Sequence, residues 1–201
     1  MKHLWSNKMM ALPRLLILNL GMIGILSING CALDAKNASI PEVSAATEHH
    51  VDSQQQQWNG PELISRRYRT LFFGYDTVYY RLSAKQATNA TPQYQLLIDI
   101  NYGSKTKRDY SLAKLTADKI LPITTRNHET MRCDFFNSMV FACLFRDRAT
   151  IDLTMADLQI GATQGLSVQL SSKDAAYDHF DVPAAYIAGV MQAIEQPSTG
   201  H

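Results

Sequence analysis

The stretch that decides the fold is QYQLLIDINY, residues Gln93–Tyr102. Its apolar side chains alternate with mostly polar ones, and the regularly spaced apolar set is Tyr94, Leu96, Ile98 and Ile100. Because successive side chains of a strand point to opposite faces, the alternation predicts a strand with one buried and one wetter side. We therefore expect an antiparallel sheet that packs one face on the rest of the domain.

On both sides of this segment, short runs rich in aromatic and β-branched residues are separated by turn residues, a pattern typical of strands joined by hairpins. The other predicted strands are Arg66–Phe73, Thr77–Leu82, Tyr110–Leu115, Thr130–Phe136, Val140–Arg146, Thr150–Leu153 and Leu166–Ser171. The fold class that follows is mainly β, a β-rich α+β arrangement with an antiparallel sheet or sandwich of about seven or eight strands.

Two helical segments are predicted near the C-terminal end. Thr154-Met155-Ala156-Asp157 has the spacing of a capping box and predicts a short helical turn across one end of the sheet. Pro183 suits the first turn of a second helix, with Asp181 as its cap. One face of this helix holds Tyr186, Ile187, Val190, Met191 and Ile194, so we expect it to dock on the sheet. It should end before Pro197, with residues 197–201 as a flexible tail.

Residues 1–30 have the features of an export leader. Lys2, Lys8 and Arg14 precede an apolar run, Leu15–Ile28, of about 14 residues. A membrane-spanning helix needs roughly 20 apolar residues, so the run has the length of a signal-peptide core.

The leader ends in Ile28-Asn29-Gly30-Cys31, with the aliphatic Ile28 three places before the cysteine and the small Gly30 just before it. This segment resembles the lipobox of bacterial lipoprotein signals. The resemblance implies that Cys31 is acylated with palmitate and the leader is removed, and Ala32 after the cysteine implies delivery to the outer membrane, facing the periplasm. A plain secretory signal, or an uncleaved anchor helix over Leu15–Leu33, is the alternative. The resemblance implies nothing about the fold after residue 31.

Residues 31–57 are rich in Ala, Ser, Asp, Glu and Gln, and they predict a disordered polar tether because they offer little apolar surface to bury. A single β-rich periplasmic domain then covers residues 58–196. Within the tether, His49 and His50 are adjacent, so they point in different directions and lack further ligands for a metal. We predict no metal site and no cofactor.

If Cys31 carries lipid, Cys133 and Cys143 remain for each other, and an oxidising periplasm permits a disulfide. Asn137-Ser138-Met139 is a turn between two predicted strands. With Ser138 at its centre, the residues that face each other are Phe135 and Phe141, Cys133 and Cys143, and Met131 and Phe145. A thiol redox centre or half of a metal site is the alternative, but neither a Cys-x-x-Cys spacing nor a histidine cluster accompanies the pair.

Charge and motifs exclude several function classes. The formal net charge is +1, and three positive charges lie in the leader, so the mature chain carries about −2 and no basic excess for a nucleic-acid partner. The chain contains no Gly-x-Ser-x-Gly, Walker lysine loop or Gly-x-Gly-x-x-Gly. In the expected domain the only histidines are His128 and His179, far apart in sequence.

Two basic clusters are candidates for a binding surface that meets anionic headgroups or an acidic partner. The first is Arg66, Arg67 and Arg69, and the second is Lys105, Lys107 and Arg108. The second follows Gly103-Ser104 in an expected hairpin turn. The alternative, a solvated loop and a protected strand edge, is the interpretation that we favour for both clusters.

The hypothesis that follows is a non-enzymatic, membrane-anchored envelope lipoprotein. It would contact the lipid bilayer through acylated Cys31, and its β-domain would bind an envelope protein or support an envelope assembly. One alternative is an envelope hydrolase that uses carboxylates such as Asp76, Asp99, Asp134, Asp147 or Asp152. Another is an immunity lipoprotein that neutralises a periplasmic toxin. A pocket where titratable groups converge would favour the hydrolase, and an exposed binding face would favour the other two.

Overall fold

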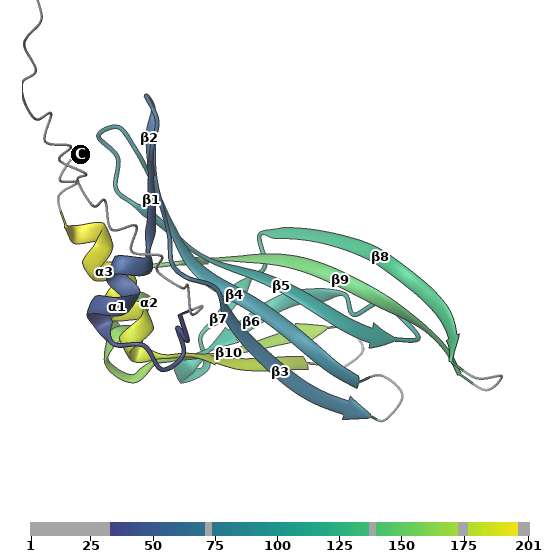
Figure 1. Ribbon diagram of the computed structural model, residues 1–201. Coiled ribbons are helices and arrows are strands. Elements are labelled where there is room, and N and C mark those ends of the chain that lie inside the picture. Colours follow the sequence, from purple (N-terminus) through teal and green to yellow (C-terminus); the bar gives the residue numbers. More distant parts are fainter. Residues whose placement is uncertain (1–32, 71–73, 137–139, 173–176, 197–201) are drawn as a thin grey trace, which may run out of the picture. The chain divides into compact units, whose positions relative to one another are not determined.

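The structure is a computed structural model that describes residues 33–70, 74–136, 140–172 and 177–196. All described residues belong to one compact unit, residues 32–201. As predicted, this unit is mainly β, with antiparallel sheets and a C-terminal helix packed on them. Figure 1 shows the sheets and the helices.

The larger sheet has seven strands within the described residues, in the order β1-β2-β4-β5-β9-β8, and β3 also pairs with β4. Its strands are β1 (Glu48–Val51), β2 (Gln55–Asn59), β3 (Leu63–Thr70), β4 (Gly74–Ala87), β5 (Gln93–Ser104), β8 (Thr125–Phe136) and β9 (Val140–Leu153). The alternation that predicted β5 is confirmed, because every second residue from Tyr94 to Tyr102 is buried.

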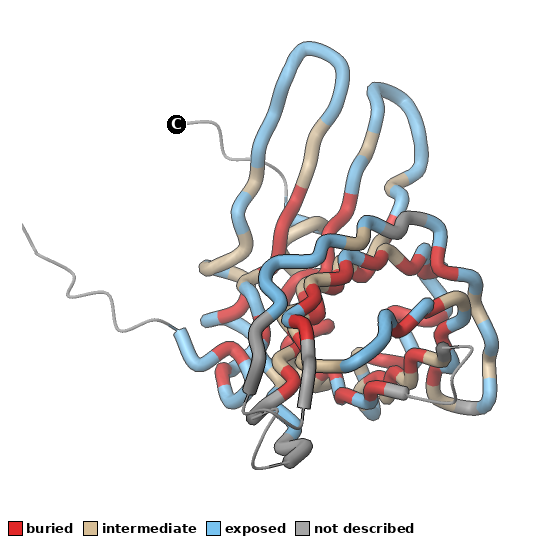
Figure 2. The backbone as a smooth tube through the Cα atoms, turned by 90° about the vertical axis from the view of Figure 1, so that its right-hand side faces the viewer, coloured by how far each residue is buried: buried red, intermediate tan, exposed pale blue. Residues whose placement is uncertain are grey.

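The smaller sheet has four strands in the described part of the chain, in the order β11-β10-β6-β7. They are β6 (Tyr110–Leu115), β7 (Ile120–Pro122), β10 (Leu166–Ser172) and β11 (Tyr177–Val182), and the short 3-10 helix η1 (Thr116–Asp118) joins β6 to β7. The inner faces of the two sheets meet in the core, where the ring of Tyr80 from β4 lies 4.4 Å from that of Phe180 from β11. Figure 2 shows the buried residues gathered inside the sheets and the exposed ones at the hairpin turns.

Three helices in the described residues gather at one end of the domain, away from the end of β8 and the start of β9 (Figure 1). They are α1 (Ile40–Ala46), α2 (Met155–Gln164) and α3 (Ala184–Glu195), and α3 packs on both others. The capping box predicted for α2 is confirmed, because the Asp157 N–H donates to the Thr154 hydroxyl and the Thr154 N–H donates to the Asp157 carboxylate.

The C-terminal helix is present with the apolar face predicted for it. Tyr186, Ile187 and Val190 are buried, and Met191 and Ile194 pack against the core at its margin. The predicted cap is wrong: Asp181 lies in β11, and Pro183 is the N-cap residue of α3.

The N-terminal part of the domain differs most from the prediction. Residues 33–57, expected as part of a disordered tether, contain α1, β1 and most of β2. Val43 of α1 is fully buried, and α1 packs on α3 at Gly189, where an added Cβ would lie 2.6 Å from the Cβ of Val43. The folded domain therefore begins well before residue 58.

Several strand boundaries also differ. The two strands predicted within residues 140–153 are the single long β9, while β1, β2, β7 and β11 have no predicted counterpart. The predicted turn at Asn137-Ser138-Met139, the end of the first predicted strand at residues 71–73, the leader with Cys31, and the tail at residues 197–201 lie outside the described residues. Among the residues that are described, no helix has the length and apolar character needed to cross a membrane.

Candidate functional site

The β8–β9 hairpin carries the disulfide that its sequence predicts. Cys133 and Cys143 are bonded, with their Cα atoms 4.0 Å apart, and the backbone register pairs Phe135 with Phe141. The third predicted pair is wrong, because the register shifts between Thr130 and Arg132. This bulge places Met131 in an exposed position and pairs Phe145 with Thr130 instead.

Arg108 lies between β5 and β6, where the chain crosses from the larger sheet to the smaller one. Its guanidinium is 2.7 Å from the Asp76 carboxylate on β4 and 3.1 Å from the Asp178 carboxylate on β11. All three residues are buried. A buried charge needs close partners to offset its desolvation, and Arg108 has one on each sheet. Arg108 is therefore an internal bridge and not part of an exposed basic cluster.

Two tyrosines extend this cluster. The Tyr110 hydroxyl donates to Asp178 and accepts from the Arg108 guanidinium, while the Tyr102 ring lies under that guanidinium at 4.3 Å. Burial, followed by the nearby Asp178 carboxylate, raises the pKa of Tyr110 well above its ordinary value. Burial acts to lower the pKa of Arg108, but Tyr110, Asp76 and Asp178 outweigh it and raise that pKa, so the guanidinium stays charged.

From Arg108 a chain of hydrogen bonds leads to a histidine and a carboxylate. The Arg108 backbone N–H donates to the Tyr102 hydroxyl (2.9 Å), which donates to Asp147 Oδ2 (3.0 Å). The other carboxylate oxygen of Asp147, on β9, pairs with Nδ1 of His128, on β8. Burial raises the pKa of Asp147, although His128 and Tyr102 act to lower it.

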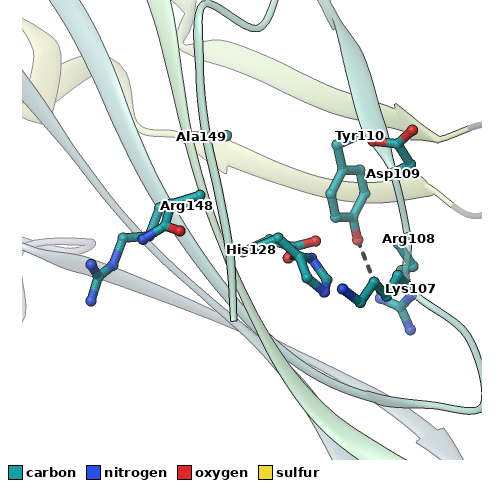
Figure 3. Close-up of a pocket in the computed structure, with 9 residues that line it drawn as sticks. Lys107, Arg108, Asp109, Tyr110, His128, Arg148 and Ala149 are labelled. Atoms are coloured by element: carbon teal, nitrogen blue, oxygen red, sulfur yellow. Dashed lines mark hydrogen bonds and ion pairs between the residues drawn. The ribbon is translucent and has the colours of Figure 1, made fainter. Parts of the chain in front are cut away.

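A pocket of about 540 Å³ opens beside this pair. Its lining includes His128, Asp147, Arg108, Tyr110 and Lys107. Figure 3 shows the Tyr110 hydroxyl directed toward Arg108, while the Arg148 side chain points away from them.

The geometry of the His128–Asp147 pair resembles half of a hydrolytic site. Asp147 orients the His128 ring through Nδ1, as a carboxylate does when histidine acts as a general base. However, Nε2 of His128 is itself buried and has no hydrogen-bond partner in the described part of the chain. None of the described residues that line the pocket is a serine or cysteine.

Another histidine brings together the residue types of a catalytic triad on the smaller sheet. The Ser167 hydroxyl lies 2.6 Å from His179 Nε2, and the Asp181 carboxylate lies 3.5 Å from the same nitrogen. A triad needs the serine and the carboxylate on opposite ring nitrogens. These three residues are therefore cross-strand neighbours on β10 and β11 and not a nucleophile with its base.

The outer face of the larger sheet carries a second site, a groove of about 540 Å³. We call it the outer groove; its outward-facing members are Glu62, Tyr79, Arg81, Leu97, Asp99, Asn127, Arg146, Arg148 and Thr150. Arg146 binds the Asp99 carboxylate through two of its nitrogens, and Nε of Arg148 lies 3.5 Å from the same carboxylate. One carboxylate thus serves two guanidinium groups, and the Glu129 carboxylate on β8 lies opposite Arg146.

The predicted basic residues do not gather into one surface. Arg66 and Arg67 are exposed on β3, whereas Lys105 and Lys107 are exposed between β5 and β6. Arg69 belongs to β3, but its side chain is outside the described ones. Arg108, the sixth member of the prediction, is the buried bridge.

The candidate carboxylates of the hydrolase alternative are similarly dispersed. Asp76 binds Arg108, Asp99 binds Arg146, and Asp152 accepts a hydrogen bond from Gln95 (2.9 Å). Asp147 lies in a pocket with His128, and Asp99 lies in the second pocket with Glu62 and three arginines. The side chain of Asp134 is outside the described ones. Sequence reasoning missed the role of His128 because its predicted strand began at Thr130, two residues too late to place His128 opposite Asp147.

The structure also places the adjacent histidines. His49 stacks on Trp58 with a ring distance of 4.6 Å, while His50 lies 3.7 Å from Glu48. Across the described residues, no three His, Cys, Asp or Glu side chains come together as a metal site.

Comparison with known proteins gives no relative: no protein-family model, no curated protein and no solved structure matches this chain.

Proposed function

We propose that this chain is a membrane-anchored envelope lipoprotein, non-catalytic, whose β-domain binds a protein partner through the outer groove. The observation that carries the proposal is the composition of that groove. An aromatic ring, three arginines and an apolar side chain, from Tyr79, Arg81, Leu97, Arg146 and Arg148, face outward on adjacent strands. Tyrosine and arginine are the residues most enriched where binding energy concentrates in protein interfaces.

The charge of the groove defines the partner's chemistry. Three arginines face the carboxylates of Glu62 and Asp99 in the groove, and Glu129 lies opposite Arg146 on β8. A partner that presents charges of both signs around an apolar or aromatic side chain would complement this surface. Because exposed charges act at the rim of such a contact, they steer association more than they hold the complex.

The anchor rests on the leader and on Cys31. A single acyl chain gives only marginal membrane binding, whereas several buried chains hold a protein firmly. Cys31→Ser should therefore abolish labelling with palmitate and move the protein from the detergent phase to the aqueous phase. Equal palmitate labelling of variant and parent would remove the anchor from the proposal.

Binding is tested by photo-crosslinking in intact cells. A benzophenone amino acid in place of Leu97 should give a discrete adduct with an envelope protein, and Arg146→Ala with Arg148→Ala should lower the yield of that adduct. The matched control is the same probe at Gln169, on the outer face of the smaller sheet. Adducts of equal yield at both positions, or an adduct indifferent to the two arginines, would contradict the proposal.

A second candidate is a hydrolase, and the His128–Asp147 pair favours it. His128 Nε2 would take a proton from water as that water attacks an ester carbonyl. The candidate stands second because Nε2 is shielded from solvent. His128→Gln should abolish any hydrolysis of nitrophenyl esters by the purified protein, and His179→Gln should leave it unchanged. Equal rates in both variants would remove this candidate.

A further inference from the structure

We infer that the helical end of the β-domain lies against the lipid bilayer and that the β8–β9 hairpin points away from it. The inference rests on the proposed acylation of Cys31, and it adds an orientation and a second membrane contact that the anchor alone does not supply.

The first step is the short reach between the anchor and the folded chain. Ala35 is only 3% exposed, and it follows Cys31 by four residues. An extended chain spans at most about 3.5 Å per residue, so this link reaches about 14 Å. The domain is therefore held at the membrane surface by a link too short to let it turn over freely.

The chain is ordered from the first described residues of this link. The Ala35 N–H donates to the Leu33 carbonyl at 2.8 Å, and the Asn37 side chain donates to the Asp34 carboxylate at 2.7 Å. Ala38, three residues after Ala35, belongs to the buried core together with Val43 of α1. The described chain is thus folded onto the domain from Ala35 onward and is not a flexible spacer there.

The second step is the distance to the opposite end. β9 holds 14 residues, and at about 3.3 Å per residue it is about 46 Å long. It runs from the disulfide-bearing hairpin directly into Thr154, the N-cap of α2. The hairpin and the helices therefore mark opposite ends of the domain (Figure 1). A link of about 14 Å at the helical end cannot bring the hairpin to the bilayer unless the domain lies on its side.

The surface beside the anchor fits a lipid interface. Leu33 and Ile40 are apolar and exposed, at 37% and 39%. The nearby charges are mixed, since Asp34 and Glu42 oppose Lys36. A contact of this kind gains from apolar burial at the headgroup boundary and has no basic cluster to select anionic lipid. We therefore expect the contact to persist at high ionic strength.

The test uses the full acylated chain bound to vesicles of phosphatidylethanolamine and phosphatidylglycerol, with a nitroxide on a fraction of the headgroups. Single cysteines at two exposed positions, Ile40→Cys on α1 and Met131→Cys on β8, carry the same fluorophore with the native disulfide intact. The label at residue 40 should lose most of its fluorescence, at low and at high salt. The label at residue 131 should keep nearly all of it.

A Gly-Ser spacer inserted between Ala32 and Leu33 serves as the matched control. It should lower the quenching at residue 40, because only the apolar contact then holds this end near the bilayer, while near-ultraviolet circular dichroism confirms an unchanged fold. Equal quenching of the two labels in vesicle-bound protein would overturn the orientation alone, whether the domain lies flat or turns freely. Quenching at residue 40 that the spacer leaves unchanged would overturn the short link as its cause. Failure of both labelled proteins to bind vesicles would overturn the anchor and the orientation together.

Discussion

Arg108 is the residue through which the two sheets are held together by charge. One guanidinium reaches Asp76 on β4 and Asp178 on β11, and its own backbone N–H binds the hydroxyl of Tyr102. Removing one partner of a buried ion pair leaves an uncompensated charge, which costs much more than the intact pair contributes.

Arg108→Met should therefore lower the free energy of unfolding by about 3–5 kcal/mol, since two buried carboxylates would lose their common cation. Urea denaturation followed by tryptophan fluorescence measures the change. Lys107→Met is the matched control, because Lys107 is exposed, and it should stay within about 0.5 kcal/mol of the parent. Similar midpoints for the two variants would show that the bridge does not hold the sheets.

Prediction from the sequence failed for the environments of single residues, such as Arg108 and His128. Arg108 follows two lysines after a glycine and a serine, a context that predicts an exposed turn charge. Its burial depends on Asp76 and Asp178, which are remote in sequence and come together only when the sheets meet. His128 and Asp147 form a pair through register, and register depends on a bulge at Met131 that the sequence does not mark.

At the scale of elements, α2 shows how a capping box and an ion pair act together. The Asp157 carboxylate accepts from Thr154 and also binds the Lys119 ammonium at 2.7 Å. Burial acts to raise the pKa of Asp157, but Lys119 and Thr154 outweigh it and hold the pKa below its ordinary value. The stability from this group is therefore present above the ordinary carboxyl pKa and is lost as pH falls through the lowered folded pKa.

Asp157→Asn should cost about 1 kcal/mol at neutral pH, since the Lys119 side chain is partly exposed and its pair with Asp157 partly screened. Urea midpoints of variant and parent should converge as the pH falls below about 4, where the parent carboxyl takes up its proton. Asp181→Asn, at an exposed carboxylate, controls for general acid effects. A difference that stays constant with pH would show that the charge of Asp157 contributes nothing.

The sequence predicted those elements whose own residues carry a recognisable pattern. β5 follows from its alternation, and α2 from Thr154 and Asp157. By contrast, β2 reads Gln-Gln-Gln-Trp-Asn, a polar segment that is a strand because it pairs with β4 on one side and β1 on the other. Polar strands of this kind are stabilised by backbone pairing that composition does not reveal.

For the whole molecule, the packing of α1 on α3 decides where the domain begins. Gly189 permits this contact, because a Cβ there would lie 2.6 Å from the Val43 Cβ and 2.8 Å from the Ile40 carbonyl oxygen. The segment before β1 was predicted as a tether because it is polar and short of apolar residues. A few side chains, Ala35, Ala38 and Val43, are enough to fix this segment. They fill a surface that belongs in part to α3, which is distant in sequence.

Gly189→Ala should destabilise the domain by about 1–3 kcal/mol through overpacking, although alanine ordinarily favours a helix over glycine by up to about 1 kcal/mol. Hydrogen exchange should show the first loss of protection in residues 40–46, with the amides of β5 and β9 unchanged. Ala188→Gly, one position away on α3, should lower stability without exposing α1. A more stable Gly189→Ala variant would show that α1 can move aside at no cost.

The contact between α1 and α3 also sets an order of events in the folding of the chain. The two helices lie at opposite ends of the described sequence, with every strand between them. Contacts across so long a separation form late, because closing the loop costs conformational entropy before the contact returns any gain. On the proposed export route, residues 40–46 would emerge early and wait without a partner until residues 184–195 had crossed. The chain would then remain incompletely folded throughout its passage and complete its fold only after arrival.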